Sequence, residues 1–312
     1  MSGFAIIVDT SCDLTEDLRE RFGIDDYLQG MVNFPDGHSE KAKLDYTEEE
    51  QLGFYTSMKD RKVMYKTATP SVGETEEIFE KYLKDGRDIL AISLSSGLSA
   101  VYSANMTIAS QLMKKYPDRK IVCIDTLRYS VAAGLVAIKA SEMRKKGMDI
   151  AEVGEYLNSF KYRIHQMGSM DDLFFLVKTG RINNFKAFFG QMIGLNLMAE
   201  FGSNGMVDVI GKCKGKKNMI DAALAYMDKT IENPSEQIIF VAHTNRPEAA
   251  KVLAEKIKER FNPKEVIIKH VNIACGATIG PGLCAAYYEG APTTDGLGKE
   301  RAIMDEIINK QK

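Results

Sequence analysis

The chain has 312 residues, with 45% hydrophobic residues, 27% charged residues and a formal net charge of −2. These values are typical of a globular protein with a sizeable core, and they argue against nucleic-acid binding through bulk positive charge. No apolar run approaches the ~18 residues of a membrane-spanning helix, and the first residues lack the basic region of a signal peptide.

The five cysteines and four histidines are scattered along the chain. No cysteine pair has CxxC spacing, and no histidine lies near a second histidine or a cysteine at ligand spacing, so we expect no disulfide framework, metal site or cofactor. A reducing cytoplasm fits this pattern best. Monomer is our default expectation for the oligomeric state.

The first half of the sequence alternates short apolar runs with helical patterns. Strands are predicted over 5–8, 31–34, 89–94 and 121–124, and helices over 17–22, 47–59, 76–83, 98–116, 129–146 and 150–160. Two helix starts carry the spacing of a capping box, Thr47 with Glu50 and Ser71 with Glu74. Alternation of strands and helices predicts a parallel sheet that helices cover on both faces.

The second half predicts a mixed sheet. Asn204-Gly205 indicates a hairpin, further strands are expected over 164–168, 237–241 and 265–273, and helices over 173–176, from 247, over 283–288 and over 298–309. We therefore predict a two-domain α/β protein: a parallel three-layer α/β/α domain over residues 1–162 and a mixed-sheet α/β domain over residues 163–312.

The most informative stretch is 88–110, where a buried-type strand ends in Ser95-Ser96-Gly97 and the chain then becomes helical. Hydroxyls and free backbone N–H groups at such a place can receive an anion, because the start of a helix carries positive partial charge. Ligands of open α/β sheets also usually lie at the carboxyl ends of the strands. The sequence thus predicts a binding site here.

Five ordered motifs resemble the DegV family of bacterial fatty-acid-binding proteins. They are Asp9-Thr10-Ser11-Cys12-Asp13-Leu14, Thr67-Ala68-Thr69-Pro70-Ser71, Ser95-Ser96-Gly97-Leu98-Ser99, Lys178-Thr179-Gly180-Arg181-Ile182 and Gly280-Pro281-Gly282. The resemblance implies two α/β domains, a long acyl chain buried in the region between them, and presentation of its carboxylate to a separate fatty acid kinase. It further implies a lipid carrier that is not an enzyme.

The resemblance also implies a set of head-group residues. The family's threonine matches Thr67, and its serine falls within Ser95-Ser96, of which Ser96 is the nearer to the expected helix start. Thr278 stands where the family usually has a histidine, and Arg181 is expected near the mouth of the site. A threonine keeps a donor and an acceptor but carries no positive charge, so this departure is expected to weaken or retune carboxylate binding.

Other departures from the family pattern are Met198-Ala199 in place of a Lys-Pro pair and Lys214 in place of an arginine. A fatty acid requires polar groups for its head and a dry channel for its tail. Each charge-assisted hydrogen bond contributes roughly 1.5–3 kcal/mol, and each buried methylene about 0.8 kcal/mol. The tail is therefore expected to dominate affinity, while the head group sets orientation.

Each motif has a structural alternative. The serines of 95–99 could only cap a helix, Ser71 is more simply a cap than a ligand contact, and Asp9 could only bind backbone amides. His243 is more simply structural, and the apolar cluster of residues 185, 188, 189, 192 and 193 belongs either to the core or to a tunnel wall.

Two rival functions remain at this level. One is a serine-dependent acyl hydrolase or transferase with Ser96 as nucleophile, although the G-x-S-x-G elbow is absent. The other is a kinase-related phosphate-binding domain, in which the glycine-rich segment 276–282 would face a phosphate without the lysine of a Walker A loop.

Overall fold

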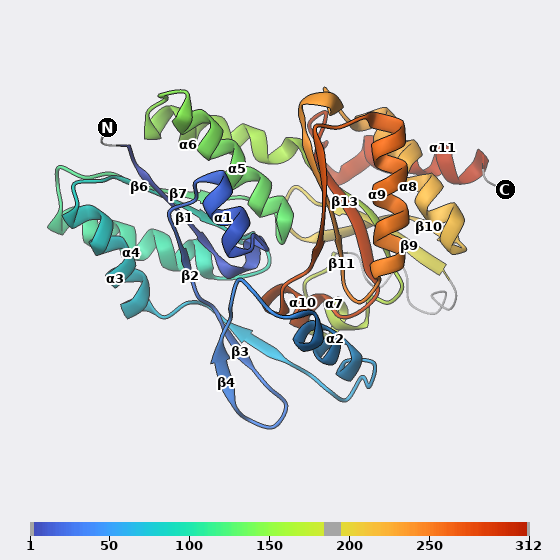
Figure 1. Ribbon diagram of the computed structural model, residues 1–312, viewed down its shortest axis with the longest axis horizontal. Helices are drawn as coiled ribbons and strands as arrows, with labels where there is room; N and C mark the ends of the chain where they lie inside the picture. The colour runs from blue at the N-terminus through green and yellow to red at the C-terminus, as the bar shows by residue number, and fades with distance from the viewer. Residues whose placement is uncertain (1–2, 184–194, 311–312) are drawn as a thin grey trace. The chain divides into compact units, whose positions relative to one another are not determined.

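The computed structural model describes residues 3–183 and 195–310. The chain folds into two compact units, which Figure 1 shows as ribbons. Unit 1 comprises Met1–Tyr46 and Tyr65–Lys161, and unit 2 comprises Thr47–Met64 and Tyr162–Lys312. The predicted division at residue 162 leaves Thr47–Met64 with the first domain, whereas this segment belongs to unit 2. The capping motif at Thr47 indicates where a helix begins but not which core that helix joins.

The main sheet of unit 1 is parallel, with the strand order β2-β1-β6-β7, and it confirms the predicted βα architecture. Ile7 and Ala91 pack with Leu112 against α3 and α4 on one face. Ile6 and Leu90 alternate with these residues and are fully buried on the other face, where α5 and α6 contact the strands. The elements of unit 1 are β1 (Ala5–Asp9), α1 (Glu16–Phe22), β2 (Asp26–Leu28), β3 (Met31–Asn33), β4 (Ser39–Lys41), β5 (Lys66–Ala68), α3 (Val72–Lys84), β6 (Ile89–Ser93), α4 (Val101–Lys115), β7 (Ile121–Asp125), α5 (Val131–Lys145) and α6 (Ile150–Phe160).

A second sheet in unit 1 has the order β4-β3-β5 and is antiparallel. The predicted strand over 31–34 forms β3, but β4 and β5 were not predicted because their largely exposed residues contain no apolar run. In this sheet Thr67 on β5 pairs with Val32 on β3. Thr67, which matches the family's threonine, therefore lies on a short strand outside the main parallel sheet.

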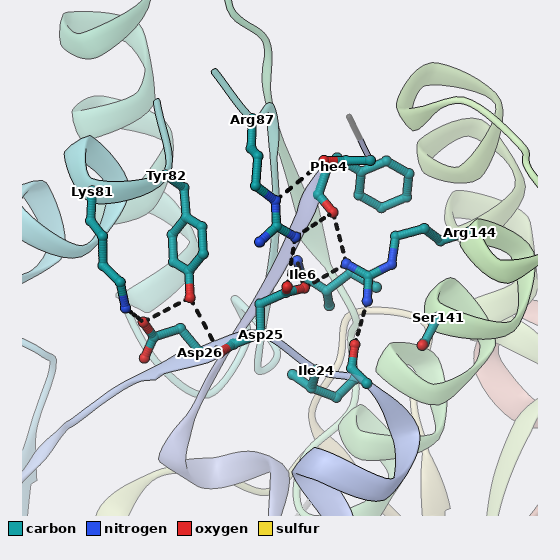
Figure 2. Close-up of polar contacts among 12 residues, drawn as sticks. Phe4, Ile6, Ile24, Asp25, Asp26, Lys81, Tyr82, Arg87, Ser141 and Arg144 are labelled. Atoms are coloured by element: carbon teal, nitrogen blue, oxygen red, sulfur yellow. Dashed lines mark hydrogen bonds and ion pairs between the residues drawn. The ribbon is translucent and has the colours of Figure 1, made fainter. Parts of the chain in front are cut away.

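An ion-pair network holds the amino end of β1 (Figure 2). The Asp25 carboxylate accepts the backbone N–H of Ile6 at 2.9 Å and pairs with the guanidinium groups of Arg87 at 2.6 Å and of Arg144. Both arginines also donate to the carbonyl of Phe4. Burial acts to raise the pKa of Asp25, but these donors outweigh it and hold the pKa below its usual value.

Unit 2 is built on a six-stranded mixed sheet with the order β10-β9-β8-β13-β11-β12. Met167, Val241 and Cys284 point to the face that α8, α9 and α11 cover. The elements of unit 2 are α2 (Glu48–Ser57), β8 (Ile164–Met170), α7 (Phe174–Thr179), β9 (Leu195–Phe201), β10 (Val207–Lys214), α8 (Lys216–Thr230), β11 (Ile238–His243), α9 (Pro247–Phe261), β12 (Glu265–His270), α10 (Ile273–Ile279), β13 (Leu283–Glu289) and α11 (Gly298–Lys310).

The helix predicted over 283–288 is wrong. This segment forms β13, an antiparallel neighbour of both β8 and β11 in the middle of the sheet. Leu283–Tyr288 is buried throughout, so it shows no alternation of polar and apolar residues, and Ala285-Ala286 locally favours a helix. Pairing on both edges overrides that propensity.

Two further boundaries differ from prediction. The helix expected from residue 98 begins at Val101, and the strand expected to run to residue 273 ends at His270. Ile273 instead begins α10, because the Asn272 side chain caps that helix by accepting the backbone N–H of Ala274 at 2.9 Å.

Candidate ligand-binding site

Ser95 and Ser96 follow β6 at the carboxyl edge of the parallel sheet of unit 1. Ser95 is fully buried, and its Oγ accepts the backbone N–H of Gly97 at 3.1 Å. Ser96 is exposed, and within the described part of the chain its hydroxyl has no hydrogen-bond partner. The motif does not distinguish Ser95 from Ser96, but in the structure Ser95 is buried and Ser96 is exposed.

The backbone of this loop does not offer the free N–H groups that the sequence predicts. The N–H of Ser95 donates to the carbonyl of Arg128 at 2.8 Å, and the N–H of Ser96 donates to the Asp125 carboxylate at 3.1 Å. Leu98 and Ser99 both donate to the carbonyl of Ser95. Because α4 begins only at Val101, these residues form a turn whose amides bond to Ser95, Arg128 and Asp125, and the Ser96 hydroxyl is the group left for a ligand.

Asp9, the last residue of β1, lies at the same carboxyl edge of the sheet. Its carboxylate accepts the backbone N–H of Ser11 at 2.9 Å and of Leu94 at 3.0 Å, and also the hydroxyl of Ser11. Burial raises the pKa of Asp9, while these hydrogen bonds act in the opposite direction. Asp9 therefore fixes the loop before Ser95, as the structural alternative for this residue expects.

Thr67 is exposed on β5, and the described part of the chain gives its hydroxyl no hydrogen-bond partner. The adjoining residue, Ala68, places its carbonyl 3.1 Å from where a Cβ on Gly30 would lie, and the N–H of Gly30 donates to Thr10 Oγ1 at 3.3 Å. Thr10 follows Asp9 directly. Gly30 thus lies close to the end of β5 and is hydrogen-bonded to Thr10, the residue after Asp9.

The two predicted site residues of unit 2, Thr278 and Arg181, already donate hydrogen bonds within the chain. Thr278 lies on α10, half-buried, and its hydroxyl donates to the carbonyl of Cys275 at 2.9 Å. Arg181 follows the left-handed Gly180 that ends α7, and its guanidinium donates to the carbonyl of Thr179. Ser71 caps α3 by accepting the N–H of Glu74 at 3.2 Å, so its structural alternative is confirmed.

The glycine-rich segment 276–282 is not a phosphate-binding loop. Its first part is the helix α10, in which a Cβ on Gly276 would overlap the hydroxyl of Tyr55. A Cβ on Gly280 would overlap the ring of Phe175, and both Gly280 and Gly282 have positive φ. Close packing and turn geometry account for these glycines.

Two residues after β11 hold this segment, and neither was singled out from the sequence. Thr244 accepts the N–H of Gly282 at 2.9 Å through its carbonyl and the N–H of Leu283 at 2.8 Å through its hydroxyl. Arg246 donates to the carbonyl of Gly282 at 3.0 Å. The sequence carried a signal for these two residues, because Thr244 and Arg246 lie between a buried strand and a helix that begins with Pro247, where functional residues of α/β sheets often lie.

His243 and His270 are neighbours in unit 2. His243 accepts the N–H of Arg246 at 3.3 Å and its ring centroid lies 4.1 Å from that of His270. Burial, with the nearby His270 and Arg246, lowers the pKa of His243 to about 3. No group of three or more His, Cys, Asp or Glu side chains over 3–183 and 195–310 is arranged to hold a metal ion.

One row of small residues crosses the sheet of unit 2. Ala242, Ala285 and Gly168 are register partners on β11, β13 and β8. They alternate with Val241 and Cys284, so they face away from α8, α9 and α11.

The predicted apolar cluster of residues 185, 188, 189, 192 and 193 lies outside the described residues. Among the helices that are described, none has the length and apolarity needed to cross a membrane.

Comparison with known proteins agrees with this architecture. A DegV domain-containing protein of Clostridium perfringens is 30% identical over 290 residues, covering 93% of this chain and 98% of that protein. A Thermus thermophilus DegV family protein, whose structure is described as showing fatty acid binding, has a TM-score of 0.82 at 20% identity and covers 93% of this chain and 100% of its own. The lipid-binding DegV protein of Thermotoga maritima has a TM-score of 0.79 at 24% identity, covering 94% and 100%.

A third solved structure is the Streptococcus pneumoniae fatty acid kinase B3 protein loaded with linoleic acid, with a TM-score of 0.76 at 19% identity and coverage of 93% and 99%. These structures share the two-part α/β fold. The family model described as "Uncharacterised protein, DegV family" matches residues 3–290. The motifs, the fold and this match lead to one conclusion: the chain belongs to the DegV family.

Proposed function

We propose that this protein binds a long-chain fatty acid and that the Ser96 hydroxyl, together with Thr67, contacts its carboxylate. The observation that carries the proposal is the contrast at the end of β6, where Ser95 is buried and hydrogen-bonded while Ser96 is exposed with its hydroxyl unengaged. A carboxylate requires donors, and two hydroxyls in one unit supply them. The fatty acids named for the related structures support this choice of ligand.

The contributions proposed for unit 2 are smaller. The hydroxyl proton of Thr278 is engaged with Cys275, so Thr278 must release that bond before it can donate to a carboxylate. Arg181 already donates to Thr179, and we assign it a long-range electrostatic role near the mouth. Head-group binding without the family histidine thus depends chiefly on neutral hydroxyls.

The acyl tail supplies most of the proposed affinity. Sixteen carbons transferred from water at about 0.8 kcal/mol per methylene contribute on the order of 10 kcal/mol before ordering costs. Ala242, Ala285 and Gly168 form a row of small residues on one face of the sheet of unit 2, and all three are buried.

We further propose that the protein is a cytoplasmic carrier that presents the carboxylate to a partner fatty acid kinase and has no catalytic activity of its own. The name of one related structure, a fatty acid kinase B3 protein, supports this partner. The single histidine of unit 1, His38, pairs with Asp36 on the turn after β3, and in the described residues no histidine makes a hydrogen bond to Ser96. This arrangement gives the serine hydrolase alternative no support.

Native mass spectrometry of the protein purified from bacterial cells tests ligand binding. We expect one fatty acid per chain in the wild type, and a smaller loaded fraction in a Ser96→Ala/Thr67→Val variant that remains folded. An empty wild-type protein that also fails to bind added oleic acid contradicts the proposal.

Presentation to a kinase is tested separately. The loaded protein is mixed with a bacterial fatty acid kinase and ATP, and acyl phosphate is trapped with hydroxylamine as the hydroxamate. Formation of hydroxamate only when both proteins are present supports the carrier role. Hydroxamate formed by this chain and ATP alone indicates catalysis instead.

A further inference from the structure

The turn Gly280-Pro281-Gly282 is held at its second glycine by three residues from two segments, the loop between β11 and α9 and the residue after β8. The N–H of Gly282 donates to Thr244 at 2.9 Å, and the carbonyl of Gly282 accepts the N–H of Asp171 at 3.2 Å and Arg246 Nη1 at 3.0 Å. Gly282 has φ 106°, and a Cβ there would lie 3.0 Å from Asp171 Cβ. The position of the turn is therefore determined closely by its neighbours.

Arg246 is the cation in this arrangement, and its side chain is only 8% exposed. Besides Gly282, its Nη1 meets Ser169 Oγ at 3.3 Å and the Asp171 carboxylate at 3.1 Å. Its Nη2 is buried without a hydrogen-bond partner in the described part of the chain. An unpaired buried donor costs stability, and the contacts to Gly282, Ser169 and Asp171 all pass through Nη1.

The first end of the same turn is the end of α10, the helix that carries Thr278. The N–H of Gly280 donates to Gly276 at 2.8 Å, and Gly280 packs against the ring of Phe175. A turn held at both ends leaves α10 little freedom to shift along its axis. Arg246 is thus linked to α10, and so to Thr278, through Gly282, Pro281 and Gly280.

We propose that Arg246 is a positioning residue for the carboxylate subsite of unit 2, because it fixes the Gly280–Gly282 turn and thereby the hydroxyl of Thr278. The inference rests on the proposed function. Arg246 lies outside the five motifs and orients the neutral side chain of Thr278 without itself contacting the carboxylate. The contacts of Arg246 to a carbonyl, a hydroxyl and a carboxylate all pass through Nη1.

The test compares two ligands that differ only in the head group, hexadecanoic acid and 1-hexadecanol, by displacement of a fluorescent fatty acid. We expect Arg246→Met to weaken binding of the acid about threefold, less than the loss expected for Ser96→Ala, and to leave binding of the alcohol unchanged. In a Thr278→Ala background, Arg246→Met should cause no further loss. The matched control is Arg301→Met, because Arg301 also donates to a strand carbonyl in unit 2, that of Val209, and pairs with Asp208.

Asp171→Asn is a second variant for the case in which Arg246→Met does not fold. Asp171 has a half-exposed side chain, and the substitution removes only the carboxylate that helps to orient Arg246. It should reproduce a smaller, acid-selective loss, and absence of that selectivity overturns the inference.

Three results overturn the assignment of Arg246. They are unchanged acid affinity in Arg246→Met, equal loss for acid and alcohol, and additive losses with Thr278→Ala. If the wild-type protein binds neither ligand, the proposed function fails together with this inference, whereas the other outcomes leave fatty-acid binding intact.

Discussion

At the scale of single residues, identical side chains acquire different roles from their surroundings. Ser95 and Ser96 are adjacent and chemically the same, but one completes a turn and the other faces solvent. Asp9 and Asp25 are both carboxylates of unit 1, and burial raises the pKa of the first while arginines hold down that of the second. Residue identity alone therefore does not assign function here.

Ser96→Ala should lower affinity for hexadecanoic acid about tenfold and change the free energy of unfolding by less than about 0.5 kcal/mol, because an exposed hydroxyl contributes to the ligand and not to the fold. The matched variant Ser95→Ala should lower unfolding free energy by about 1 kcal/mol, since its buried Oγ accepts Gly97. Displacement titrations and denaturant unfolding measure both. Equal effects of the two variants contradict this assignment.

Asp25→Asn should lower the unfolding free energy by about 3 kcal/mol, because it leaves two arginines without their carboxylate. The folded pKa of Asp25 lies below the unfolded value of 3.8, so its stabilisation is complete above that pH and is lost as the pH falls through the folded pKa. Denaturant unfolding between pH 7 and pH 2 should therefore show a steeper acid loss in the wild type than in the variant. Parallel pH profiles would exclude this role.

At the scale of elements, α2 and α10 show how glycine and tyrosine set the distance between two helices. The Tyr55 hydroxyl donates to the carbonyl of Val271 at 2.7 Å, just before α10 begins. Gly276 allows this approach because it has no Cβ to meet the tyrosine ring. The contact belongs wholly to unit 2, although Tyr55 lies far earlier in the sequence.

Gly276→Ala should lower unfolding free energy by about 1–3 kcal/mol, since the added methyl group overlaps the Tyr55 ring and hydroxyl. Gly53→Ala in α2 is the matched control, because no atom lies within 4 Å of the added methyl group. It should raise stability by about 0.5–1 kcal/mol through helix propensity. Thermal unfolding of both variants is the measurement, and a stabilising Gly276→Ala would contradict the packing.

At the scale of the whole molecule, the two compact units are not successive stretches of sequence. The chain leaves unit 1 after Tyr46, returns at Tyr65 and leaves again after Lys161. Unit 2 therefore needs a helix from the first third of the chain to cover α10. A division of the sequence at residue 162 separates that helix from its core.

A fragment of residues 162–312 should consequently be less stable than the same fragment joined to residues 47–64 through a flexible linker. The reason is that the isolated fragment exposes the surface of α10 that Tyr55 covers, and it loses the hydrogen bond to Val271. Hydrogen exchange of α10 amides and thermal unfolding provide the comparison. Identical protection in both fragments would show that the excursion contributes nothing to unit 2.

The sequence by itself determined the βα alternation of unit 1, the hairpin at Asn204-Gly205, the cap at Thr47 and the family to which the chain belongs. These features depend on local periodicity, turn chemistry and motif order, which are readable without knowledge of distant contacts. Only the tertiary structure decided that 283–288 is a central strand, that 47–64 joins unit 2 and that Ser95 and Ser96 differ. Each of these depends on pairing or burial between residues far apart in sequence, and such contacts override local propensity because they bury whole side chains and complete their hydrogen bonds.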